Sequence, residues 1–177
     1  MPDRPAVFFD RDGTLMEEVD YCNNPADVRA IAGAADGLAR LRAAGWMIII
    51  ITNQSGLSSG KITQVQYEAV NAELIRQLDG LIDAVYFCPD APANPTHRRK
   101  PGTGMLEEAS CEHGIDLTRS WMVGDKDIDI LCGRKAGCRT ILVETGYGKN
   151  HLSVDADFIS QDVTSAIAII QELPQSP

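Results

Sequence analysis

Acidic residues stand at two points where a short apolar run gives way to polar sequence. Asp10 and Asp12 follow the run AVFF in the segment D-R-D-G-T, and Asp125 follows the run WMV in the segment G-D-K-D. Carboxylates that converge repel each other unless a cation lies between them, and hard oxygen ligands suit Mg²⁺. Mg²⁺ prefers one or two carboxylates together with water and a phosphate oxygen. The pattern therefore predicts a magnesium site that acts on a phosphate.

Hydroxyl, amide and cationic groups stand at two further points of the chain. Thr52 and Asn53 follow the apolar run MIIII and supply donors of the kind that hold phosphate oxygens. Arg99 and Lys100 lie beyond a third apolar run, in a segment long enough to reach the same cleft. Acidic, metal-binding and anion-binding groups therefore occur together, which is what phosphoryl transfer requires.

The elements that must position these residues alternate between short β-branched or aromatic runs and helical patterns, which indicates βαβ units around a parallel sheet. Pro89–Pro101 holds four prolines and is predicted to be a loop. Strands are expected at Ala6–Phe9, Trp46–Thr52, Ala84–Cys88, Ser120–Val123, Thr140–Val143 and Asp157–Ile159, and helices at Ala35–Ala44, from Thr63 onward, and at Met105–His113, Ile128–Ala136 and Val163–Leu173. Residues 1–177 are thus predicted to form one α/β domain, a doubly wound, Rossmann-like parallel sheet, whose ligands bind beyond the carboxyl ends of the strands.

Length and charge restrict the classes of function. A chain of 177 residues fits one domain, and its formal net charge of −9 argues against a nucleic-acid backbone or an anionic membrane as partner. The longest apolar run, Trp46–Ile51, is far shorter than the roughly 20 residues that span a membrane. The first residues, Met1 to Arg4, lack the pattern of a signal peptide, and the five cysteines form no C-x-x-C pair. We expect a cytoplasmic monomer that binds a small molecule.

Four short motifs, in order along the chain, resemble the signature of the haloacid dehalogenase superfamily of phosphatases. They are D-x-D-G-T at Asp10, Thr52 after its apolar run, Lys100, and G-D-x-x-x-D from Gly124 to Asp129. The longer segments F-x-D-R-D-G-T, T-N-Q-S-G, R-K-P followed by G-M-L, and M-V-G-D-K are similar to those of the heptose-bisphosphate and histidinol-phosphate phosphatases in that superfamily. The resemblance covers nearly the whole chain.

The resemblance implies a two-step hydrolysis of a sugar phosphate. Heptose 1,7-bisphosphate, cleaved at its 7-phosphate, is the expected substrate, and histidinol phosphate or another small phosphomonoester is the alternative. Asp10 would attack phosphorus and form an aspartyl-phosphate. Asp12 would protonate the leaving oxygen and then activate water. Mg²⁺ would be held by the Asp10 carboxylate, the backbone carbonyl of Asp12, and Asp125.

The same resemblance assigns the substrate-binding groups. Thr52 and Lys100, assisted by Asn53, would bind the transferred phosphoryl group, and Arg99 would recognise the rest of the substrate. Larger relatives carry an inserted cap domain, but here core elements fill the intervals between the motifs, so no cap domain is expected. Specificity must then come from three loops, Glu18–Tyr21, Gln54–Lys61 and Ala91–Arg99. The further candidates are Glu18, Asp20, Tyr21, Gln54, Ser55 and Lys126, while Asp127 and Asp129 fit equally well as partners of the site or as a solvated helix start.

The loop before R-K-P departs from the heptose and histidinol relatives, which usually bind a structural zinc there through C-x-H and C-x-C. Cys88 remains, but Asp90, Thr96 and Arg98 stand at the other three ligand positions. One ligand of four does not make a zinc site, so zinc is not expected.

A phospho-accepting receiver domain is the alternative from a different functional class. Receivers are also parallel α/β domains with acidic residues, Mg²⁺, a Thr and a Lys at strand ends. They carry the accepting Asp after the third strand, where this chain has Cys88 and Pro89. This difference favours the phosphatase.

Overall fold

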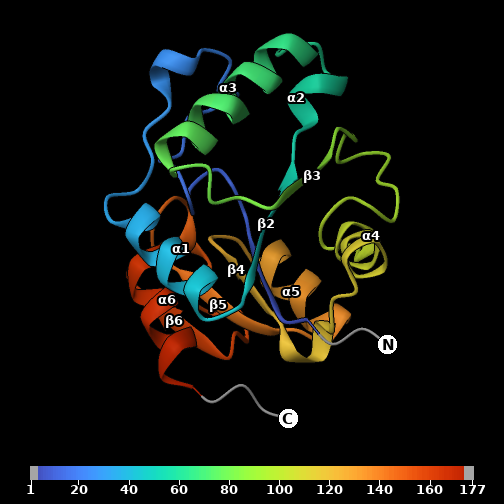
Figure 1. The fold of residues 1–177 in the computed structure, drawn as a ribbon. Coiled ribbons are helices and arrows are strands. Elements are labelled where there is room, and N and C mark those ends of the chain that lie inside the picture. Colours follow the sequence, from blue (N-terminus) through green and yellow to red (C-terminus); the bar gives the residue numbers. More distant parts are fainter. Residues whose placement is uncertain (1–3, 174–177) are drawn as a thin grey trace.

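The computed structural model describes residues 4–173, which form a six-stranded, all-parallel sheet between two layers of helices (Figure 1). The strand order is β3-β2-β1-β4-β5-β6, so the chain runs outward from β1 to β3 and then returns to lay β4 beside β1. The strands are β1 Ala6–Phe9, β2 Met47–Asn53, β3 Ala84–Cys88, β4 Trp121–Gly124, β5 Arg139–Val143 and β6 Phe158–Ser160. The prediction of a doubly wound Rossmann-like sheet is confirmed.

The strand sequences explain why the sheet is covered on both faces. In β2 the residues from Met47 to Thr52 are all buried, and β1 is buried throughout. Continuous apolar runs of this kind suit a parallel sheet with helices on both sides. Alternate residues of β1 divide between the two layers, with Phe9 in one core and Phe8 in the other.

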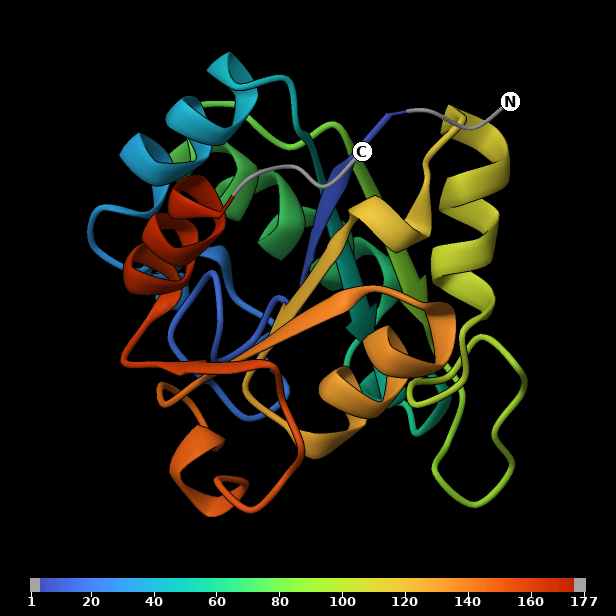
Figure 2. The ribbon, with the colours of Figure 1, turned by 90° about the horizontal axis from the view of Figure 1, so that it is seen from below.

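Two sets of helices cover the two faces. One layer holds α1 (Ala34–Ala43), α3 (Gln64–Gln77) and α6 (Val163–Glu172), and the other holds α4 (Gly104–His113) and α5 (Asp127–Ala136). Figure 2 shows α1 and α6 side by side on one side of the strands and α4 and α5 on the other. No inserted domain interrupts the described residues, in agreement with the predicted absence of a cap.

Local signals in the sequence fix several helix ends. The Thr63 hydroxyl accepts the backbone N–H of Gln66, while the Gln66 side chain accepts the N–H of Thr63, which is a complete capping box at the start of α3. Helices α4 and α5 end at Gly114 and Gly137, both in the left-handed conformation that glycine adopts without a steric penalty.

The structure corrects the prediction in the segment after β2. Ser55–Ser58, expected to be part of a loop, forms the short helix α2, and single 3-10 turns occur at Pro25–Asp27, Leu117–Arg119 and Gly148–Asn150. Such segments are too short to show a helical hydrophobic period, so the sequence gives no signal for them. The boundaries of the other predicted elements shift by at most one residue. Within residues 4–173, no helix has the length and apolar character needed to cross a membrane.

Candidate active site

The candidate site lies where the direction of winding reverses, beyond the carboxyl ends of β1 and β4. Asp10 follows β1 and Asp125 follows β4, and the backbone N–H of Asp10 donates to the carbonyl of Val123 at 2.9 Å. Carboxylate oxygens of Asp10, Asp125 and Asp129 all lie within 4.8 Å of one another, and all three residues are buried. The predicted convergence of Asp10 and Asp125 is therefore present in the fold.

Lys100 links this acidic cluster. Its ammonium lies 2.7 Å from Asp10 Oδ1 and 2.6 Å from Asp129 Oδ1, and it donates to the carbonyl of Ile51 at 2.8 Å. Lys100 is only 2% exposed. Burial by itself would lower the pKa of Lys100, but the charges of Asp10 and Asp129 outweigh it and raise the pKa above the ordinary value. The lysine therefore stays cationic inside the protein.

The carboxyl groups show the opposite effect of burial. Desolvation raises the pKa of Asp10 to about 6, with Lys100 opposing the rise. Desolvation, together with the charges of Asp10 and Asp129, raises the pKa of Asp125 to about 8. One lysine is thus insufficient to compensate three converging carboxyl groups.

The donor set fits Mg²⁺. Asp125 Oδ2 accepts the backbone N–H of Tyr147 at 2.8 Å, whereas Asp125 Oδ1 is buried and has no hydrogen-bond partner among the described residues. A buried oxygen of this kind normally has a partner, and the Asp125 carboxylate to which it belongs has an oxygen within 4.8 Å of one from Asp10. Hard carboxylate oxygens with no nitrogen or sulfur donor among them are suited to Mg²⁺.

Thr52, Asn53 and Gln54 connect the end of β2 to the other motifs. The Asn53 amide donates to the Lys100 carbonyl at 3.1 Å and accepts the Lys100 N–H at 3.1 Å. The Gln54 amide donates to Thr52 Oγ1 at 2.8 Å and to Asp12 Oδ2 at 2.9 Å. Asn53, predicted to assist phosphate binding, thus uses its side chain to hold the backbone of Lys100.

Arg11 is a site residue that the sequence reasoning missed. Its guanidinium donates to both oxygens of the Asp12 carboxylate, from Nε to Oδ2 at 3.0 Å and from Nη2 to Oδ1 at 3.1 Å. Nη1 donates to Asn71 Oδ1 at 2.8 Å, and the group lies 5.6 Å from the ring centroid of Tyr67, so Arg11 anchors Asp12 to α3. Arg11 is 1% exposed. The one sequence signal for this role is the position of a cationic residue between two acidic residues in D-R-D.

The two candidates at the start of α5 separate clearly. Asp129 is buried, contacts Lys100, and accepts the backbone N–H of Lys126 at 3.0 Å through Oδ2. The side chain of Asp127 is about half exposed and lies 3.5 Å from His151 Nδ1. Asp129 therefore belongs to the cluster, and Asp127 lies at a solvated helix start.

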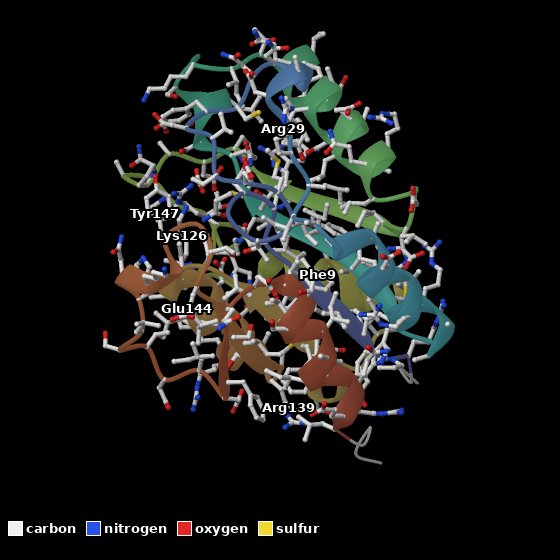
Figure 3. The ribbon with its side chains drawn as sticks, turned by 90° about the vertical axis from the view of Figure 1, so that its left-hand side faces the viewer. Phe9, Arg29, Lys126, Arg139, Glu144 and Tyr147 are labelled. Atoms are coloured by element: carbon white, nitrogen blue, oxygen red, sulfur yellow. The ribbon has the colours of Figure 1, made fainter. Side chains whose placement is uncertain are left out.

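Most of the predicted substrate-binding residues share one cleft next to the cluster. The Lys126 ammonium lies 3.9 Å from Glu18 Oε2. It also lies 4.5 Å from the ring centroid of Tyr147 (Figure 3). Lys61 covers the ring of Tyr21 at 3.7 Å. The predicted residues that line this cleft are Asp12, Glu18, Asp20, Tyr21, Asn53, Gln54, Ser55 and Lys126. An inner hollow shares Asp12, Asn53 and Lys126 with this cleft. It is lined by Asp10, Asp12, Thr52, Asn53, Lys100, Lys126, Ile128 and Asp129.

Arg99 lies in a different hollow from these residues. That hollow is formed by the proline-rich loop, with Pro92 and Pro95 in its wall, and Arg99 donates to the carbonyl of Asp90 at 2.7 Å. Lys100 lines both this hollow and the inner one. Arg99 is therefore adjacent to the acidic cluster but separate from the cleft that Glu18 and its neighbours line.

Hydrogen bonds close the proline-rich loop that precedes Lys100. Asp90 Oδ2 accepts the backbone N–H of Thr96 at 2.8 Å and its hydroxyl at 2.5 Å. Arg98 donates to the carbonyl of Phe87 at 3.2 Å. Asp90, Thr96 and Arg98, which stand at the other three ligand positions, therefore make hydrogen bonds within the chain.

Known proteins are similar to this chain in sequence and in fold. A family model described as HAD-hydrolase-like matches residues 97–166. The chain is 40% identical to the D-glycero-D-manno-heptose-1,7-bisphosphate 7-phosphatase of Thermosynechococcus vestitus, over 93% of this chain and 94% of that protein. It is 32% identical to the D-glycero-beta-D-manno-heptose-1,7-bisphosphate 7-phosphatase of Escherichia coli K12, over 97% of this chain and 93% of that protein. The crystal structure of D,D-heptose 1,7-bisphosphate phosphatase from B. bronchiseptica, complexed with magnesium and phosphate, superposes with a TM-score of 0.88 at 29% identity, over 96% of this chain and 99% of that chain.

Proposed function

Because the chain belongs to the haloacid dehalogenase-like hydrolases, we propose that it is a Mg²⁺-dependent phosphatase that removes the 7-phosphate of D-glycero-D-manno-heptose 1,7-bisphosphate. The named activity of the relatives, matched over more than nine-tenths of this chain, supports the substrate. The observation that carries the reaction class is the Lys100 ammonium held between Asp10 and Asp129, beside Asp125. Histidinol phosphate or another small phosphomonoester is the alternative substrate.

The metal would be held by the Asp10 carboxylate, Oδ1 of Asp125 and the backbone carbonyl of Asp12. When bound, Mg²⁺ supplies positive charge that neutralises the phosphate oxygens and the nucleophile as they approach each other. Asp129 has one oxygen on Lys100 and the other on the backbone N–H of Lys126, so we assign it to holding Lys100.

In the first step Asp10 attacks phosphorus. A bond forms between an Asp10 oxygen and phosphorus, the bond from phosphorus to the sugar oxygen breaks, and Asp12 gives a proton to that oxygen. The ammonium of Lys100 and the hydroxyl of Thr52 bind the transferred group and stabilise its charge. Both border the inner hollow that Asp10 and Asp12 line, which supports this assignment.

In the second step a water molecule attacks phosphorus and releases Asp10. Asp12 takes the proton from that water and is ready for the next turnover. The Arg11 guanidinium and the Gln54 amide hold the Asp12 carboxylate, so we assign them to orienting it. A proton donor and acceptor placed in this way contributes about 10²- to 10⁴-fold to the rate.

The sugar would be selected by the loops around the site, since no cap covers it. Glu18, Asp20, Tyr21, Ser55 and Lys126 line the cleft in which the sugar would lie. Arg99, in the neighbouring hollow, would contact the part of the substrate that is remote from the cleaved phosphate.

The proline-rich loop would work without zinc, because Asp90 and Thr96 already close it. Metal analysis of protein washed with chelator tests this directly. We expect no stoichiometric zinc, and one zinc per chain would contradict the assignment.

We also infer a cytoplasmic monomer that binds neither nucleic acid nor membrane. The net charge of −9 and the five free cysteines support this, because free thiols suit a reducing compartment. Size-exclusion chromatography with light scattering tests the oligomeric state.

The experiment that tests the function compares kcat/KM for both anomers of the heptose bisphosphate, histidinol phosphate and other sugar phosphates, with Mg²⁺ and with EDTA. We expect the highest kcat/KM for one heptose anomer and loss of turnover in EDTA. Preference for histidinol phosphate would establish the alternative substrate. Stable phosphorylation of the protein without turnover would favour a receiver-like signalling role.

A further inference from the structure

We infer that the segment Glu144–Gly148, which follows β5, is a positioning element of the metal site: it fixes the Asp125 carboxylate so that only Oδ1 faces the cation. The segment lies outside the four motifs and contributes no side chain to the acidic cluster. The inference rests on the proposed function, because it assumes that Asp125 is a metal ligand.

The first observation is the unequal use of the two oxygens of Asp125. Oδ2 accepts the backbone N–H of Tyr147 at 2.8 Å, and Oδ1 is buried without a hydrogen-bond partner among the described residues. A carboxylate with one oxygen fixed by a rigid backbone donor has little freedom to rotate. The segment thereby presents a single oxygen as a ligand.

The second observation is the close approach of three backbone segments around this carboxylate. Gly13 and Gly146 both have positive φ, +79° and +56°. A Cβ on Gly146 would lie 2.7 Å from the Cα of Gly13 and would collide with Asp125 Oδ2, and a Cβ on Gly13 would lie 2.5 Å from the same oxygen. Only glycine satisfies both the conformation and the space, so the two glycines pack directly on Asp125.

The third observation is a side-chain tie between the segment and the loop that carries the nucleophile. The Thr145 hydroxyl donates to the carbonyl of Gly13 at 2.6 Å. Gly13 follows Asp12 directly and lies three residues from Asp10. One hydroxyl thus keeps the segment in register with both aspartates, and Thr145 itself touches neither of them through a hydrogen bond.

Tyr147 takes part through its backbone, since the N–H that holds Asp125 does not depend on the side chain. Tyr147 is 41% exposed, and its ring lies beside the ammonium of Lys126 (Figure 3). A Tyr147→Phe variant keeps both the N–H and the ring and is expected to bind Mg²⁺ as the wild type does.

The test measures Mg²⁺ binding to the full chain by isothermal titration calorimetry, without substrate. Thr145→Val removes the hydroxyl and nearly keeps the shape, and we expect it to weaken Mg²⁺ binding about 10- to 100-fold, as loss of an orienting partner does. Thr145→Ser keeps the hydroxyl and is expected to restore binding. Thr118→Val removes a hydroxyl that bonds Asp116 at 2.7 Å, away from the site, and is the matched control.

Two outcomes would overturn the inference: wild-type Mg²⁺ affinity in Thr145→Val, or an equal loss in Thr145→Ser. If Thr145→Val has a lowered Tm, Thr145→Ala replaces it in the test. Thr145→Ala adds no bulk and is expected to weaken Mg²⁺ binding to the same extent. Asp125→Asn separates this inference from the proposed function. Retained Mg²⁺ binding in Asp125→Asn contradicts the metal site itself, whereas lost binding there together with wild-type affinity in Thr145→Val contradicts only the role of the segment.

Discussion

The residues around the site form two groups that differ in burial and in how they are held. The cluster at the strand ends is buried. Each member contacts another member or a backbone N–H, except Thr52, whose hydroxyl accepts the Gln54 amide. The rim is partly or fully exposed and lies on loops and at the start of the short helix α2. The cluster comprises Asp10, Thr52, Lys100, Asp125 and Asp129, and the rim comprises Glu18, Asp20, Tyr21, Ser55 and Arg99.

This difference separates two tasks. In the cluster, removal of one charge leaves its partner buried and unpaired, so the groups are energetically coupled. On the rim, water replaces a lost partner, and under the proposed function a substitution would change mainly the contacts with the sugar. The fold therefore fixes the reaction at the strand ends and leaves substrate choice to segments that tolerate change.

The largest effect is expected for Lys100→Met, which leaves Asp10 and Asp129 without their cation. Loss of one partner from a buried ion pair costs about 3–5 kcal/mol. Urea unfolding should show a loss of that size, and Lys100→Met combined with Asp129→Asn should recover part of it. Lys61→Met on the exposed face of Tyr21 is the control and should change the free energy of unfolding little. Strict additivity of the two cluster substitutions would show that the cluster is not coupled.

Asp12→Ala tests whether the carboxylate held by Arg11 is the proton donor. We expect kcat/KM for sugar phosphates, whose leaving oxygen needs a proton, to fall about 10²- to 10⁴-fold. The fall should be much smaller for p-nitrophenyl phosphate, because p-nitrophenolate leaves without protonation. Asp127→Ala, on the same edge of the sheet but solvated, should leave both values nearly unchanged. Equal losses on both substrates in Asp12→Ala would exclude this role.

The metal-free cluster is expected to make stability depend on pH. The pKa values of Asp10 and Asp125 are raised to about 6 and about 8, so between about pH 4 and pH 8 the folded chain holds protons that the unfolded chain releases. Stability of the metal-free protein therefore falls as pH rises through this window. Mg²⁺ pairs with the ionised carboxylates, so the gain in Tm on adding Mg²⁺ should grow with pH. A gain that is independent of pH, or unchanged in Asp125→Asn, would contradict this.

The smallest effect is expected on the rim. Tyr21 lines the cleft and packs against Gly56, and Tyr21→Ala removes that wall. We expect KM for the sugar phosphate to rise about tenfold, as loss of uniform binding does, with kcat nearly unchanged. Turnover of p-nitrophenyl phosphate is the internal control. A large fall in kcat on both substrates would place Tyr21 with the cluster.

The cluster was largely predictable from the sequence, because parallel strands carry whatever follows them to one edge of the sheet. The positions of Asp10 and Asp125 could be predicted from the two apolar runs that precede them. Asp127 and Asp129 could not be separated in this way, since both fall in the first turn of α5. The helical phase decides between them: it turns Asp129 inward to Lys100 and Asp127 outward to water.

The remaining contacts depend on side-chain directions within tight turns, for which the sequence carries little signal. Arg11 lies between two acidic residues in the sequence. Its hydrogen bonds to Asp12 and Asn71, however, depend on the conformation of the turn after β1. Thr145 follows an ordinary strand, and its bond to Gly13 joins residues 132 positions apart in the chain. Such contacts can be predicted only once the order of the strands in the sheet is known.

The most direct test of the central claim, that Asp10 attacks phosphorus, is to locate the phosphoryl group on the protein. Protein turning over p-nitrophenyl phosphate with Mg²⁺ is quenched in acid, treated with borohydride, which reduces an aspartyl-phosphate to homoserine, and mapped by mass spectrometry. We expect homoserine at position 10, at higher occupancy in Asp12→Ala, where hydrolysis of the intermediate is slowed. Homoserine at another position, or turnover retained in Asp10→Asn, would contradict the claim.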